Sequence, residues 1–248
     1  MLVDAGSAFV APVAPTRAGW AFEAWYADAA CETPYDFAKT PVENGVAEGG
    51  TLRLYAKYLA KRGQLPTTDG AENATWELSD DGTLKIASAP GATIKSIGWD
   101  PTKADANVEG KWNDKHWGSM RDEVGRIEMA PGLKAEDTDC WFAEMHNLVD
   151  VSGAYVPEGV QKVNRMFFRC TSLGVVSDGF SIPEGVVEAS DMFGYCSSLA
   201  SLPSGFTLPT TLTNANHLFD SCTSLERVPL NCLMVCKTQW VCSEDASA

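Results

Sequence analysis

Residues 166–173 (MFFRCTSL), 192–199 (MFGYCSSL) and 218–225 (LFDSCTSL) repeat one pattern, with 26 residues between equivalent positions. Each copy carries Phe, Cys, Ser and Leu at the same relative positions, while the residues between them vary. Apolar identity is kept where a shared interior needs it and lost where solvent is expected. A fixed period of roughly 20–50 residues is the signature of a solenoid, whose copies bury one another's apolar sides.

A fourth, looser copy precedes these three and is one residue shorter. It begins at Trp141-Phe142 and has Met145 in the cysteine column. About four copies exceed the usual minimum for a stable stack. The side chains that we expect to form the common core are Phe142, Leu148, Phe167, Cys170, Leu173, Phe193, Cys196, Leu199, Phe219, Cys222 and Leu225.

The local sequence predicts the course of one copy. Residues 199–202 (LASL) are expected to form a short strand that ends at Pro203 and Gly205, both turn residues. Residues 214–219 (NANHLF) fit a helical turn, with Asn214 as its cap. A strand, a corner, a short helix and a return together describe a leucine-rich-repeat coil.

The repeat also resembles a known family. Residues 202–209 (LPSGFTLP), followed by 218–225, are similar to the BspA-like leucine-rich repeats of bacterial surface proteins. The segment from Trp76 to Ile127 resembles the region that precedes such repeats. The resemblance implies a leucine-rich-repeat fold, export to the cell surface and a role in recognition.

A different module precedes the repeats. Residues 12–26 (PVAPTRAGWAFEAWY) and 51–58 (TLRLYAKY) resemble the internalin B-repeat, or Listeria–Bacteroides repeat, a small β-grasp-like stalk domain. Ala24 replaces the usual Gly, Tyr58 replaces the usual Trp, and the family's opening strand is missing. Within residues 51–58, alternate apolar side chains predict a half-buried strand.

These observations predict an α+β, mostly β chain in which a leucine-rich-repeat solenoid of about four coils follows a truncated β-grasp-like module. The expected boundaries are as follows: partial internalin B-repeat at 1–60, linker at 61–75, N-terminal flank or cap of the solenoid at 76–137, BspA-like repeats at 138–230 and an irregular tail at 231–248.

Charge and hydropathy restrict the partners. With 19 basic and 33 acidic residues the net charge is −14, so phosphate backbones and anionic lipids are repelled. No run of about 18 apolar residues is present, so we expect no membrane insertion. The start, Met1 to Asp4, lacks the features of a signal peptide. We therefore expect a fragment of an extracellular, cell-surface protein that lacks its leader and wall anchor, and we expect it to be monomeric.

The eight cysteines favour structural roles. Cys170, Cys196 and Cys222 are expected to be small buried hydrophobic residues. A disulfide between two of them stays open, because a strand spacing of about 4.8 Å falls within the Cα range for such a bond. Cys31 and Cys140 are each isolated in the sequence and are expected to be structural. The spacing of Cys232, Cys236 and Cys242 fits a zinc site poorly. No metal and no cofactor are expected.

Motifs for catalysis are missing from the sequence: there is no nucleophile elbow, no zinc-protease motif, no P-loop and no dinucleotide fingerprint. A His217–Cys222 dyad is disfavoured, because His217 falls in a variable, solvent-facing column and Cys222 in the core. We therefore expect no catalytic residues and no enzymatic activity. A surface glycan-active enzyme remains an alternative, as does a passive stalk.

The favoured function is an adhesin-like recognition module that binds a protein or glycan of a host or bacterial surface. Its contacts are expected from variable positions on the strand side of the repeats. Few aromatic or Arg residues cluster on this side, so no binding hot spot stands out there. The candidate ligand-binding residues are Asp150, Val175, Ser201 and Arg227, which share one column, and Glu226 in the adjacent column with Val149, Gly174 and Ala200.

Overall fold

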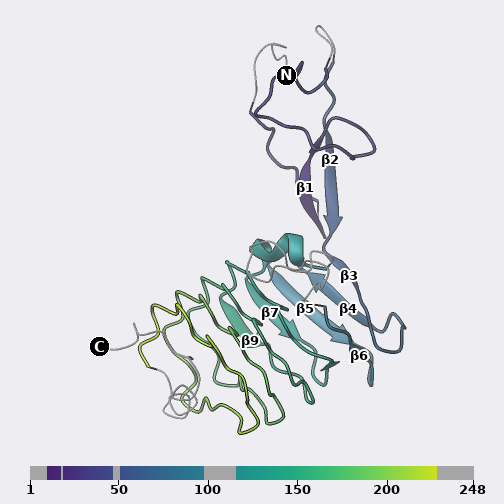
Figure 1. The fold of residues 1–248 in the computed structure, drawn as a ribbon. Coiled ribbons are helices and arrows are strands. Elements are labelled where there is room, and N and C mark those ends of the chain that lie inside the picture. Colours follow the sequence, from purple (N-terminus) through teal and green to yellow (C-terminus); the bar gives the residue numbers. More distant parts are fainter. Residues whose placement is uncertain (1–9, 18, 47–50, 98–115, 228–248) are drawn as a thin grey trace. The chain divides into compact units, whose positions relative to one another are not determined.

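The structure, a computed structural model, describes residues 10–17, 19–46, 51–97 and 116–227. The described chain is rich in β-structure and contains almost no helix, as Figure 1 shows. It forms two compact units, residues 1–61 and 62–248, and each is described here by itself. The predicted tail at 231–248, with Cys232, Cys236 and Cys242, lies outside the described residues.

The first unit is built on an antiparallel pair, β1 (Trp20–Tyr26) and β2 (Tyr55–Ala60), whose register shifts between Phe22 and Ala24. Phe22 packs edge-on against Tyr58, with ring centroids 6.2 Å apart. The predicted strand at 51–58 thus begins later, at Tyr55. Burial alternates as predicted over residues 51–54 but not in β2, where all six side chains are half-buried. A two-stranded ribbon with so small a core cannot cover one face fully.

The second unit begins with a five-stranded sheet in the order β3-β4-β5-β7-β9. Its first three strands are antiparallel, and β5, β7 and β9 run parallel. A second, short pair joins β6 and β8. The strands are β3 (Arg62–Leu65), β4 (Ala74–Leu78), β5 (Thr83–Ser88), β6 (Thr93–Ile94), β7 (Arg126–Met129), β8 (Lys134–Ala135) and β9 (Asp150–Gly153).

The predicted linker at 61–75 therefore contains a paired strand. Pro66 and Gly70 suggested a loop, and they do form the connection between β3 and β4. The strand itself was missed because β3 has only four residues and one buried apolar side chain, Leu65. The segment forms a strand because its backbone pairs with β4.

The repeat copies lie side by side in Figure 1. Their Phe rings stack in one column. The centroids are 5.6 Å apart for Phe142 and Phe167, 5.4 Å for Phe167 and Phe193, and 5.7 Å for Phe193 and Phe219. The residues expected in the common core are buried, except Leu225, which is half-buried. Val228, three residues after Leu225, lies outside the described residues.

Backbone hydrogen bonds link each copy to the next at every second residue. The N–H groups of Arg165 and Phe167 donate to the carbonyls of Ser190 and Met192, both at 2.9 Å, and the same pattern recurs one copy later. The residues between them donate three positions back within their own copy, as Phe168 does to Arg165. The result is a chain of tight turns that pairs with its neighbours.

The predicted helical turn at 214–219 is therefore wrong. Hydrogen-bonded turns occupy this segment, and His217 has a left-handed backbone with φ of 56°. A left-handed residue cannot continue a right-handed helix. The same conformation occurs twice in every copy, at Cys140, Glu144, Arg165, Arg169, Asp191, Tyr195, His217 and Ser221. The predicted strand at 199–202 is likewise reduced to a single bridge at Ser201.

The interior cysteines form a second column. The thiols of Cys170, Cys196 and Cys222 each donate a hydrogen bond to a Phe carbonyl of the preceding copy, at 3.1 Å in all three cases. All three are free thiols. Burial raises the pKa of Cys170 and of Cys222 to about 12. These thiols therefore stay protonated at neutral pH and are poor nucleophiles.

Candidate recognition surface

The predicted ligand-binding residues follow one backbone ladder. Asp150 lies in β9, and Val175 forms a parallel bridge with Ser201 in the next copy. Beside this column, Ala200 donates its N–H to Gly174 at 2.9 Å, and Glu226 donates to Ala200 at 3.4 Å. The ladder places equivalent residues of successive copies next to each other, so one ligand could span several copies.

Exposure along this ladder is high. Val175 is 57% exposed, and Val149 in the adjacent column is 59% exposed. Ser201, Glu226 and Arg227 are also exposed. Singly exposed apolar side chains are common on protein surfaces, so the two valines show that this face is open to solvent.

Asp150 differs from the rest of the column because its charge is already engaged. Its carboxylate accepts a hydrogen bond from the N–H of Ser152 at 2.8 Å and forms an ion pair with Arg126 at 3.0 Å. The hydroxyl and N–H of Ser152, and the Arg126 charge, lower the pKa of Asp150. A ligand would have to compete with these partners, so Asp150 is the least available member of the column.

The same outward face continues across the sheet. The strand register places Arg62 opposite Glu77, Glu77 opposite Lys85, and Lys85 opposite Glu128. Charges of opposite sign therefore alternate along this row, and Lys85 and Glu128 approach to 3.7 Å. Exposed ion pairs of this kind contribute little to stability. Their effect on a ligand is to cancel the local field.

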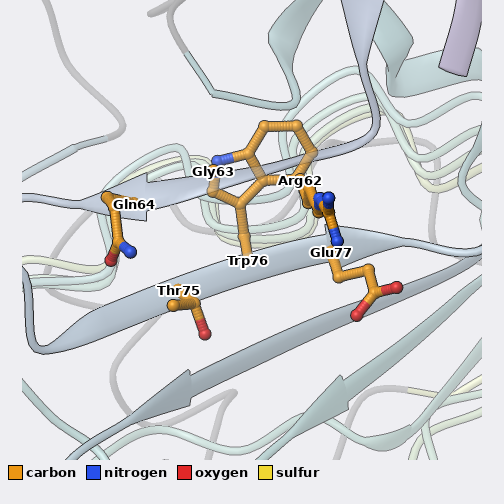
Figure 2. A pocket seen from close by; sticks show the side chains of 6 residues that line it. All are labelled: Arg62, Gly63, Gln64, Thr75, Trp76 and Glu77. Carbon is orange, nitrogen blue, oxygen red and sulfur yellow. The ribbon is translucent and has the colours of Figure 1, made fainter. Parts of the chain in front are cut away.

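At β3 and β4 the sheet is hollowed (Figure 2). The hollow has a volume of about 410 Å³ and is lined by Arg62, Gly63, Gln64, Thr75, Trp76 and Glu77. Sequence analysis missed it, since four of these six residues fall in the stretch predicted to be a linker. A free ligand-sized space depends on which strands pair, and the local sequence does not reveal this.

Sequence analysis also missed a cation–aromatic cluster that the repeats form on their turn side. Arg169 lies 5.4 Å from the ring centroids of both Phe168 and Tyr195, and Tyr195 is 42% exposed. Arg169 also lies 3.9 Å from Glu144. Arg169 and Tyr195 are 26 residues apart, and this spacing was the available signal. Because its charges are matched internally, the cluster is best explained as a clamp between copies.

The possible catalytic pair is not assembled among these residues. His217 is exposed, whereas the Cys222 thiol is buried and donates to the Phe193 carbonyl. The acidic residues Asp80 and Asp81 lie in the hairpin turn between β4 and β5. Hydrogen bonds from Ser79 and Thr83 lower the pKa of Asp81 to about 2. This carboxylate stabilises its own turn.

Helices that could cross a bilayer are absent from the part of the chain that the structure describes.

Comparison with known proteins finds a family similarity within the first unit. The family model of the Listeria-Bacteroides repeat domain matches residues 1–57. Among solved structures, a leucine-rich repeat protein from Eubacterium ventriosum is similar at 12% identity, over 66% of this chain and 72% of that chain, with a TM-score of 0.22. So low a score carries no argument about the fold. No curated protein matches.

Proposed function

We propose that this chain is a non-enzymatic recognition module of a bacterial surface protein. In this proposal its second unit is a BspA-like leucine-rich-repeat solenoid of about four coils that binds a protein or glycan of a host or bacterial surface. The first unit, with its match to the Listeria-Bacteroides repeat domain, acts as a stalk. The module acts outside the cell, as a monomer.

One observation carries the proposal, namely the straight column of Val175, Ser201 and Arg227 on the outward side of the repeat copies. Bridges and hydrogen bonds between copies hold its members at neighbouring positions on a ladder. Such a surface can be extended by adding copies, which is how repeat proteins build large binding faces. Val175, exposed and apolar, is the residue that gains most from being covered.

A non-enzymatic role agrees with the chemistry of the groups that could react. The interior thiols have pKa values raised by burial and donate to backbone carbonyls. The exposed column contains an aspartate paired with Arg126, a valine, a serine and an arginine. Specific binding needs none of the groups that catalysis requires.

The proposal predicts that charge introduced on the column abolishes binding. Cells or cell-wall glycans of candidate hosts and bacteria would be probed with the purified chain, and with Ser201→Glu/Arg227→Glu. We expect the double variant to bind at least about tenfold more weakly, which corresponds to about 1.4 kcal/mol, because two carboxylates replace a neutral and a basic contact. Bound protein would be quantified by fluorescence.

Gln161→Glu is the matched control, since Gln161 is exposed on a different side of the same repeats. The control should bind like the unmodified chain. If the double variant also binds normally, or if no surface binds the unmodified chain, the module is a passive spacer. Turnover of a glycan or peptide substrate by the chain would contradict the non-enzymatic assignment.

A further inference from the structure

One edge of β2 is open among the described residues of the first unit. There β1 and β2 form a two-stranded ribbon, and no other described strand pairs with β2 (Figure 1). The N–H of Lys61, directly after β2, donates to the Gly19 carbonyl at 3.1 Å and so points towards β1. Peptide groups of alternate residues point to opposite edges of a strand. The N–H and C=O groups of Ala56, Tyr58 and Ala60 therefore point to the open edge.

The partners of β1 lead to the same direction for Ala56. Trp25 lies opposite Ala56, and the Trp25 carbonyl accepts the N–H of Tyr35 at 2.8 Å. Opposed residues of an antiparallel pair point either both towards each other or both away. The Trp25 carbonyl is engaged outside the ribbon, so the peptide groups of Ala56 also point away from it. The outer edge of β1 is thus partly used, while that of β2 is open.

An open strand edge fits another extended backbone, because its donors and acceptors alternate at the spacing of a strand. Natural proteins protect such edges with proline, bulges or free charges. In β2 there is no proline, and the bulge of the pair lies in β1, between Phe22 and Ala24. Lys57 is the single charged residue of β2, and Glu23 holds its Nζ at 3.0 Å. The edge therefore remains available to an extended peptide segment.

The side chains next to the edge favour apolar residues on one face of that segment. Tyr58 lies opposite Phe22, and Ala60 lies opposite Trp20. Directly opposed residues share a face, so these aromatic rings lie on the face of Ala56, Tyr58 and Ala60. Trp20 is 37% exposed. Because the two alanines are small, apolar side chains of an added strand have room to extend this aromatic face.

Charge favours acidic residues on the other face. Residues 51–61 (TLRLYAKYLAK) contain Arg53, Lys57 and Lys61 and no acidic residue, in a chain of net charge −14. Their even spacing places these basic side chains on one face of an extended strand, opposite to that of Tyr58. Two copies of β2 paired about Lys57 would set Lys57 against its equivalent and Arg53 against Lys61. Like charges directly opposed are destabilising, so a second copy fits this edge poorly.

We propose that the open edge of β2 binds an extended segment of a partner protein as an added strand, and that acidic and apolar residues alternate in this segment. Backbone hydrogen bonds at Ala56, Tyr58 and Ala60 supply the attachment, and the two faces of the ribbon select the sequence. The inference goes beyond the proposed function, in which the first unit acts as a stalk.

The test measures amide hydrogen exchange at Tyr58 and Ala60 by NMR on the full chain, with an octapeptide of alternating Glu and Val as the probe. We expect an affinity of about 0.1 mM. Exchange at both amides should slow by at least about tenfold when the peptide is bound, because both N–H groups become hydrogen-bonded. A Lys-Val octapeptide should bind at least about tenfold more weakly, and so should a Glu-Pro octapeptide, whose prolines cannot donate.

Ala60→Pro removes the outward N–H of Ala60 and keeps the bond from Lys61 to Gly19, so it should weaken binding at least about tenfold. Ala60→Val retains the N–H and is the matched control, which should bind the Glu-Val peptide normally. Unchanged exchange at the Lys61 amide shows that the ribbon of Ala60→Pro is folded. If that variant unfolds, the comparison of the Glu-Pro and Glu-Val peptides decides, because it uses the unmodified chain.

The site is overturned if the Glu-Val peptide leaves exchange at Tyr58 and Ala60 unchanged, or if the Glu-Pro peptide or folded Ala60→Pro binds equally well. Slow exchange at these amides in the dilute free chain would mean that another segment of this chain covers the edge. Protection that rises with protein concentration would mean that a second copy does. Either result overturns the assignment to a partner protein, and equal or tighter binding of the Lys-Val peptide overturns the acidic class.

Discussion

Single residues in the repeats hold conformations that their side chains alone would not favour. Arg165, Arg169 and their equivalents adopt left-handed backbone angles, which cost roughly 1 kcal/mol or more for a residue other than glycine. In the first three copies these residues donate their N–H groups to the next copy, at 2.9 Å from Arg165 to Ser190. Pairing between copies offsets the local cost. A single copy on its own would therefore not keep this backbone.

Asp139 shows how the first copy differs from the others. Its carboxylate accepts hydrogen bonds from the N–H and amide of Asn164, at 2.7 and 3.3 Å. Burial, and secondarily the charge of nearby Asp137, raise the pKa of Asp139 to about 6. Asn164, Ser190 and Asn216 occupy the same position in later copies, so only the first copy places an ionisable group there.

This predicts a pH-dependent stability. The folded-state pKa of Asp139 lies above the unfolded value of about 3.9, so the folded protein holds the proton more tightly. The contribution is full below about pH 4 and is lost as pH rises through about 6. Relative to the unmodified chain, Asp139→Asn should therefore gain about 1–3 kcal/mol between pH 4 and pH 7. Urea unfolding at several pH values measures this difference.

Asp81→Asn is the control with the opposite sign, because the pKa of Asp81 is lowered to about 2. The contribution of Asp81 is present above about pH 4 and is lost as pH falls towards 2. A free-energy difference for Asp139→Asn that stays constant from pH 4 to pH 7 would contradict the assignment.

Among the structural elements, the segment around the 3-10 helix η1 (Gly118–Glu123) closes the first end of the repeats. Trp117, just before this helix, stacks on Phe142 with ring centroids 6.4 Å apart and so extends the Phe column. Its Nε1–H donates to the Trp141 carbonyl at 2.8 Å. In the following copy the equivalent carbonyl, that of Met166, accepts the backbone N–H of Phe142. The indole thus replaces a missing preceding copy.

Trp117→Phe tests this cap, because it keeps an aromatic ring and removes the N–H donor together with part of the buried indole volume. A buried carbonyl left without a partner costs about 1–3 kcal/mol, so the free energy of unfolding should fall by at least about 1 kcal/mol. Chemical denaturation followed by circular dichroism measures it. Trp20→Phe, at a partly exposed site in the first unit, should change the stability of the second unit by less than about 0.5 kcal/mol. Equal effects of the two variants would rule out the cap.

Across the whole molecule, the second unit depends on continuity between copies. Phe193 contacts Phe167 on one side and Phe219 on the other, and it is fully buried. Each copy therefore owes its interior to its neighbours. In a stack of this kind, stability is a sum of copy and interface contributions.

Phe193→Ala should reduce the free energy of unfolding of the second unit by about 3–5 kcal/mol, the usual cost of removing a buried aromatic ring. The loss should spread to both sides, so hydrogen exchange should speed up at the amides of Phe167 in the preceding copy and of Leu218 in the following copy alike. Val175→Ala, at an exposed site, is the control and should leave both rates unchanged. Faster exchange confined to the copy of Phe193 would contradict a shared core.

The period of the sequence alone identified the core columns and their order. A buried column needs apolar side chains whatever the backbone does between them, so Phe142 to Phe219 could be aligned by spacing. The hairpin at Asp80 and Asp81 was also predictable, because its turn chemistry is local. Two other features were not predictable: the strand β3, and the left-handed turns that replace the expected helical turn at 214–219. Their partners lie about 9 to 27 residues away, outside the local pattern.

The amino-acid sequence thus determined which side chains share an interior, because burial selects residue type at a fixed interval. Only the tertiary structure decided that tight, left-handed turns replace the expected helix, since hydrogen bonds to the next copy compensate a backbone that no isolated segment would adopt. It also decided the hollow at Trp76, because a space between side chains exists only after β3 and β4 have paired. Local preference yields in both places to contacts between distant segments.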